Sequence, residues 1–123
     1  MEKAPRPVAW VGSSRQDLKA FPADVQDGVG FALWLAQIGE KHPHAKVLKG
    51  FGGASVIEII EDYDGDAYRA VYTVRFHEAV YVLHAFQKKS RRGAKTPKPD
   101  LELIQKRFRD AKAWHEAKRK GRS

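Results

Sequence analysis

Apolar residues recur at helical spacing in two long segments of the chain, residues 22–38 and residues 97–117. A stripe of apolar residues three or four positions apart is typical of a helix with one buried face, so we expect a helix in each segment. The apolar arc of the first segment is wide, because it also includes Phe31, Trp34 and Ile38. Either this helix is buried on two sides, or its outer side binds a partner.

A short apolar run at residues 8–11 predicts a first strand, and a short helix is expected after it over residues 14–20. Ser13 is a favourable N-cap residue for this helix. Gln16 follows three positions later, which is the spacing of a capping box. We therefore expect two helices in the N-terminal part of the chain and one in the C-terminal part.

Three further segments are rich in β-branched and aromatic residues: 55–62, 68–76 and 79–88. Asp64-Gly65 supplies the left-handed residues of a tight turn between the first two, and His77-Glu78 is a plausible turn before the third. These segments predict an antiparallel meander. Together with the helices, they indicate an α+β protein with a single domain over residues 1–123, frayed at 1–6 and 118–123.

Strand alternation separates two faces of the segment 68–76. Arg69 and Arg75 share the more polar face and lie roughly 20 Å apart along the strand, so they can contact successive phosphates but not the same one. Each arginine can instead be an ordinary ion-pair partner, and Glu58 on the neighbouring strand is placed to pair with Arg69.

The segment 79–88 places His84, Phe86 and Lys88 on one face with the valines at positions 80 and 82. An imidazole titrates near neutrality, so His84 is a candidate for proton transfer, although a histidine between valines is more often structural. Phe86 can stack on a base or belong to the core.

Charged residues are distributed unevenly along the chain. Residues 1–86 hold 9 Lys and Arg against 11 Asp and Glu, whereas residues 87–123 hold 14 against 4. Such a distribution indicates an anionic partner, or else a solvated basic tail. Five cations stand close together at the end of the last strand, which favours phosphate binding: Lys88, Lys89, Arg91, Arg92 and Lys95. The basic residues of the last helix, Arg107 among them, fall mostly off its apolar stripe.

Other classes of site are not expected. The chain has no cysteine, so disulfides and thiolate sites are excluded. His42 and His44 have the spacing of a metal pair but no third ligand nearby, and no cofactor motif is present. No segment approaches the roughly 18 apolar residues of a membrane span, and we expect a cytoplasmic protein that does not bind membranes.

The chain resembles the phage-derived, HigB-like branch of the RelE/ParE superfamily of toxin–antitoxin toxins over roughly residues 7–115. The resemblance rests on the order of elements and on five motifs: Leu48-Lys-Gly50, the strand of Glu58, Tyr68-Arg-Ala-Val-Tyr72, Leu83-His-Ala-Phe-Gln-Lys-Lys89 and Thr96-Pro97. It implies a RelE-like fold with a small antiparallel sheet of about four strands, mixed at its edge.

The resemblance also implies an mRNA interferase that cleaves mRNA on the ribosome without a metal or cofactor, and whose antitoxin is a helix-turn-helix protein. By position, Arg69 matches the family's phosphate-binding arginine, and Lys88 and Lys89 match its basic pair. Glu58 stands where a general base or its structural partner is found. Lys49 matches a basic residue before that strand.

Two features depart from the family pattern: Ile60 replaces a common basic residue, and the loop after Lys89 has no tyrosine. Two alternatives on the same fold therefore stay open: a ParE-type inhibitor of DNA gyrase, and an inactive module that binds nucleic acid. We expect Glu58, Arg69, Lys88 and Lys89 to be catalytic. The residues expected to bind RNA or the ribosome are Lys49, Arg75, His84, Phe86, Arg91, Arg92 and Lys95.

Overall fold

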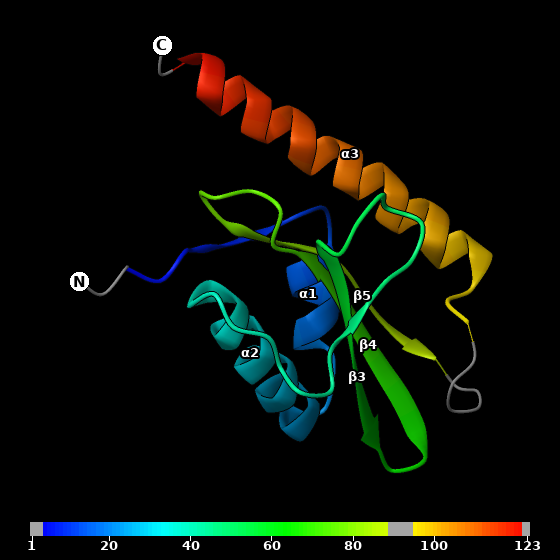
Figure 1. Cartoon of the computed structure of the whole chain (residues 1–123). Coiled ribbons are helices and arrows are strands. Elements are labelled where there is room, and N and C mark those ends of the chain that lie inside the picture. Colours follow the sequence, from blue (N-terminus) through cyan, green and yellow to red (C-terminus); the bar gives the residue numbers. More distant parts are fainter. Residues whose placement is uncertain (1–3, 89–94, 122–123) are drawn as a thin grey trace.

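The computed structural model describes residues 4–88 and 95–121, which form one sheet with helices on both of its faces (Figure 1). The elements along the chain are β1 (Val8–Trp10), α1 (Ser14–Lys19), α2 (Ala23–Gln37), β2 (Lys46–Val47), β3 (Val56–Tyr63), β4 (Asp66–Thr73), β5 (Val80–Lys88) and α3 (Lys98–Gly121). No helix among these residues is long and apolar enough to cross a bilayer.

The sheet has five strands in the order β1-β5-β4-β3-β2. Strands β2 to β5 pair antiparallel, and β1 pairs parallel with β5, so the sheet is mixed at this edge. The α+β class is therefore confirmed. The strand count is five rather than about four, because Lys46 and Val47 pair with β3 and form a short edge strand.

Two apolar cores lie on opposite faces of the sheet. The first core packs α1 and α2 against the sheet and includes Val29, Ile59 and Tyr72. The second core packs α3 against the other face and includes Val71 and Ile104. Because both faces are covered, most of β4 is buried, and the face predicted to be the more polar one lies largely under α3.

A β-bulge in β5 changes the predicted distribution of side chains. Tyr72 is opposite Val82 and Val71 is opposite His84, so Leu83 is an extra residue on β5. The prediction that His84 shares a face with Val82 is therefore wrong. Val82 belongs to the first core, whereas His84 stacks on a phenylalanine beside the second.

The start of α1 also differs from the prediction. Ser13 precedes the helix, but its hydroxyl makes no cap hydrogen bond to the backbone and instead donates to the carboxylate of Asp17 at 2.7 Å. The capping box with Gln16 is consequently not formed. The boundaries of the longer elements agree with the predictions to within a few residues, except that β4 ends at Thr73 and α3 extends to Gly121.

Candidate functional site

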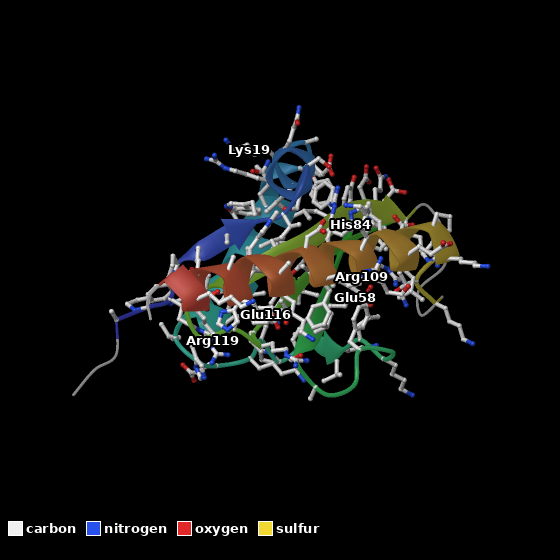
Figure 2. All side chains as sticks on the ribbon, turned by 90° about the horizontal axis from the view of Figure 1, so that it is seen from above. Lys19, Glu58, His84, Arg109, Glu116 and Arg119 are labelled. Carbon is white, nitrogen blue, oxygen red and sulfur yellow. The ribbon has the colours of Figure 1, made fainter. Side chains whose placement is uncertain are left out.

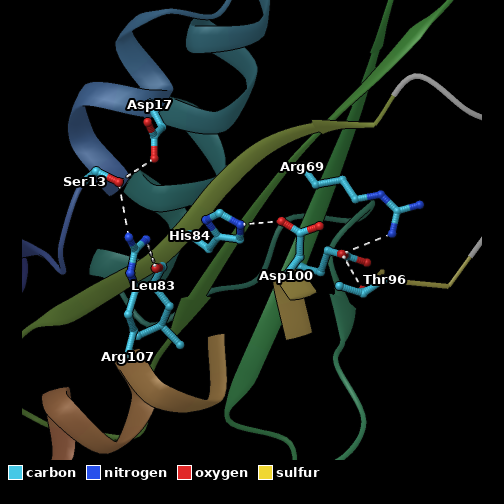
Figure 3. A network of polar contacts seen from close by, with 9 residues as sticks. Ser13, Asp17, Arg69, Leu83, His84, Thr96, Asp100 and Arg107 are labelled. Atoms are coloured by element: carbon cyan, nitrogen blue, oxygen red, sulfur yellow. Dashed lines mark hydrogen bonds and ion pairs between the residues drawn. The ribbon is translucent and has the colours of Figure 1, made fainter. Parts of the chain in front are cut away.

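Polar side chains gather on the sheet face that carries α3, close to the N-terminal end of that helix (Figure 3). Strand register explains the grouping: Arg69 is opposite Ile60 on one side and Phe86 on the other, and Glu58 is opposite Val71. Side chains that are opposite each other in a sheet point to the same face. Three strands thus direct their polar residues to one place, and Figure 2 shows Glu58 and His84 beside the N-terminal half of α3.

Glu58 and Arg69 form a buried ion pair at this place. The Arg69 Nη1 donates to Glu58 Oε2 at 3.3 Å, and the two side chains are 2% and 8% exposed for Arg69 and Glu58 respectively. The hydroxyl of Thr96, just before α3, donates to the same carboxylate oxygen at 3.3 Å. Because a buried charge requires a partner, the carboxylate holds the guanidinium in one position on the sheet. The predicted pairing of Glu58 with Arg69 is observed.

His84 forms the second polar pair. Its Nε2 lies 2.7 Å from Asp100 Oδ1 in the first turn of α3, and its ring stacks on Phe86 with centroids 4.7 Å apart. His84 is 6% exposed, and its Nδ1 has no hydrogen-bond partner among the described residues. The pair therefore attaches the start of α3 to β5, which favours a structural role for this histidine over proton transfer.

An open pocket of about 430 Å³ adjoins the ion pair. Its lining comes from β3 and β4 and from the segment that leads into β2: Pro43, His44, Lys46, Ile60, Asp62, Ala67 and Arg69. Lys46 is exposed and is opposite Glu58 in the register of β2 with β3. The lining thus contains an exposed cation, Lys46, a buried one, Arg69, and one acidic residue, Asp62, and the two cations suit a phosphate group.

The basic residues at the end of β5 begin next to this pocket. Lys88 is opposite Ala67, which lines the pocket, and its Nζ donates to the backbone oxygen of Lys95 at 2.7 Å. Lys95 itself is exposed. The remaining cations predicted here, Lys89, Arg91 and Arg92, lie outside the described residues.

Two of the predicted binding residues lie apart from the pocket. Arg75 follows the end of β4, is exposed, and places its guanidinium carbon 5.9 Å from the ring centroid of Phe108 in α3. Lys49 is exposed beside the start of β3, where the backbone N–H of Leu48 bonds to Val56. Neither residue lines the pocket that contains Arg69.

Sequence reasoning missed several residues of this region, and Arg107 is the clearest example. Arg107 is 9% exposed, donates from Nη1 to the backbone oxygen of Leu83 at 2.9 Å, and donates from Nη2 to Ser13 Oγ at 3.2 Å. The statement that it lies off the apolar stripe of α3 is wrong. Its position between Ile104 and Ala111, at spacings of three and four, was the available signal.

The groups whose pKa values are clearly shifted lie away from the pocket. Burial alone acts to raise the pKa of Glu78, but a hydrogen bond from Tyr81, a backbone hydrogen bond at Glu78 and contact with His115 together outweigh it and lower that pKa below its usual value. Burial raises the pKa of Tyr72 to about 12, and burial with the Glu78 contact raises that of Tyr81 to about 12. These groups belong to the structural framework at the other end of β4 and β5.

Comparisons with known proteins give a match to a solved structure and a match to a protein family. The structure is similar to a chain of the RelBE2 toxin–antitoxin complex from Mycobacterium tuberculosis, with 21% identity and a TM-score of 0.45, covering 73% of this chain and 100% of the other. No curated protein matches the sequence. The model of the family described as phage-derived protein Gp49-like matches residues 16–109, which is well over half of the chain. This match confirms the predicted relationship to phage-derived proteins, and the chain belongs to the Gp49-like family of phage-derived proteins.

Proposed function

We propose that this protein is the toxin of a toxin–antitoxin pair and that it cleaves messenger RNA on the ribosome. The observation that carries the proposal is the buried Arg69, held by Glu58 at an open pocket that Lys46 also lines. The sequence resemblance to phage-derived interferases agrees with it. The proposal includes a cytoplasmic location, a helix-turn-helix antitoxin as partner, and no metal or cofactor.

The chemistry would be an attack of the ribose 2′-hydroxyl on the adjacent phosphate. This reaction forms a 2′,3′-cyclic phosphate and releases the 5′-oxygen of the next nucleotide, and negative charge accumulates on the phosphate oxygens in the transition state. A guanidinium that is already fixed stabilises that charge without reorganising during the reaction. Arg69 and Lys46 would supply this stabilisation, and Lys88 with the following basic residues would hold the RNA backbone.

Glu58 fits a positioning role better than that of a general base. Its carboxylate is buried, and one oxygen already accepts hydrogen bonds from both Arg69 and Thr96. A base must reach the proton that it removes. Glu58 would therefore act through Arg69, by keeping the guanidinium in place.

The test is expression of the chain in growing bacteria, followed by mapping of new mRNA 5′ ends and measurement of growth. We expect new ends within translated regions, and we expect Lys46→Ala to reduce both cleavage and growth inhibition by roughly tenfold or more. Lys19→Ala is the matched control, because Lys19 is an exposed lysine at the end of α1 and does not line the pocket. It should behave like the wild type.

Arg69→Ala gives a stronger test if the variant remains folded by circular dichroism, and Arg15→Ala is its control, because Arg15 is exposed in α1 and does not line the pocket. Growth inhibition that comes with DNA breaks and no new mRNA ends would refute cleavage and indicate the gyrase-inhibitor alternative. Undiminished cleavage by soluble Lys46→Ala and Arg69→Ala variants would place the RNA site elsewhere.

A further inference from the structure

The segment that forms one wall of the pocket is a hydrogen-bonded turn with two histidines. The backbone N–H of Ala45 donates to the oxygen of His42 at 3.0 Å, and the backbone N–H of His44 donates to His42 Nδ1, also at 3.0 Å. Pro43 between them has a restricted backbone. The ring of His42 packs edge-on against Phe31 of α2 with centroids 5.6 Å apart, so the turn is anchored to the body of the protein.

This turn places His44 at the pocket, with its ring edge-on to the ring of His42 at a centroid distance of 5.3 Å. His44 is exposed and lines the same pocket as Lys46 and Arg69. All five histidines of the chain lie within the described residues, and the other four have different surroundings: His42 supports the turn, His77 is exposed in the loop before β5, His84 pairs with Asp100, and His115 pairs with Glu78.

We infer that His44 is the catalytic residue that takes the proton from the ribose 2′-hydroxyl, an inference that rests on the proposed function. Imidazole is the side chain whose reference pKa best suits a general base at neutral pH. A phosphate on Arg69 and Lys46 would bring the ribose that carries it to the pocket that His44 also lines. The preceding nucleotide of a single-stranded RNA supplies that ribose.

The 2′-hydroxyl transfers its proton to the neutral imidazole of His44, and the 2′-oxygen forms a bond to phosphorus. The bond from phosphorus to the 5′-oxygen breaks, and that oxygen takes a proton from solvent. The products are a 2′,3′-cyclic phosphate and a 5′-hydroxyl, and His44 returns its proton to solvent before the next cycle.

The experiment compares the wild type with His44→Gln and with the control His77→Gln in single-turnover cleavage of mRNA on purified ribosomes between pH 5 and pH 9. We expect His44→Gln to slow the cleavage step by roughly 10²- to 10⁴-fold with an unchanged KM for ribosome-bound mRNA. The fall in rate at acidic pH, where a base must be unprotonated, should also disappear. His77→Gln should keep the rate and the pH profile of the wild type.

A second variant separates a chemical role from a structural one: added imidazole should restore part of the activity of His44→Ala. Wild-type rate and pH profile in His44→Gln would overturn the inference and leave the proposed function intact. A raised KM with an unchanged cleavage rate would also overturn it, because His44 would then bind RNA without moving a proton. If the wild type forms no cyclic-phosphate ends, the proposed function fails first.

Discussion

Removal of the Glu58 carboxylate should strongly destabilise the fold. In Glu58→Ala the guanidinium of Arg69, whose side chain is 2% exposed, loses the carboxylate 3.3 Å away, and the Thr96 hydroxyl loses its acceptor. Breaking a buried ion pair from one side typically costs about 3–5 kcal/mol, because the remaining charge stays out of water. We expect a loss of this size in the free energy of unfolding, measured by urea denaturation.

A double-mutant cycle tests the physical reason. Arg69→Ala alone leaves the Glu58 carboxylate buried, whereas the double variant Glu58→Ala/Arg69→Ala leaves no unpaired charge. The double variant should therefore be more stable than the two single losses predict, by about 2–3 kcal/mol.

The matched control is the exposed ion pair of Lys106 and Asp110 in α3. Lys106 Nζ lies 3.0 Å from Asp110 Oδ2, and the two residues are four positions apart. Its coupling energy should be about 0.5 kcal/mol or less, because both partners are solvated. A coupling of that small size for the buried pair as well would refute the reasoning, since Glu58 would then not hold Arg69 in place.

Two further predictions concern the framework. Gly12→Ala should lower the melting temperature, because Gly12 has a φ of +56° and an added Cβ would lie 2.8 Å from the Arg107 guanidinium. Gly30→Ala should raise the melting temperature, because an added Cβ there would meet nothing within 4 Å. Stability should fall as the pH rises from about 10 towards 12, because the unfolded chain ionises its tyrosines near 10.0 while Tyr72 and Tyr81 in the folded protein have pKa values of about 12. Urea denaturation at several pH values tests this, and Tyr72→Phe should reduce the fall.

Much of the fold was predictable because its signals are local. The apolar period of α2 and the turn at Asp64-Gly65 identify the long helix and the central hairpin without knowledge of the rest of the chain. Strand alternation also identified the pairing of Glu58 with Arg69. The pocket was not predictable in the same way, because Lys46 belongs to a strand of two residues that exists through its pairing with β3.

The β-bulge at Leu83 could not be predicted from the local sequence pattern of β5. The arrangement of the site depends on this bulge. Without an extra residue in β5, His84 would continue on the face of Val82, in the core under α1 and α2, and Asp100 of α3 would have no imidazole to contact. The bulge moves His84 to the α3 face. Arg107 bonds to the backbone oxygen of Leu83 and so stabilises the irregular backbone from the helix that the bulge helps to position. Both Asp100 and Arg107 of α3 thus contact the bulged part of β5, and the direction of the side chains there accompanies tertiary contacts that the alternation of residues along the strand does not reveal.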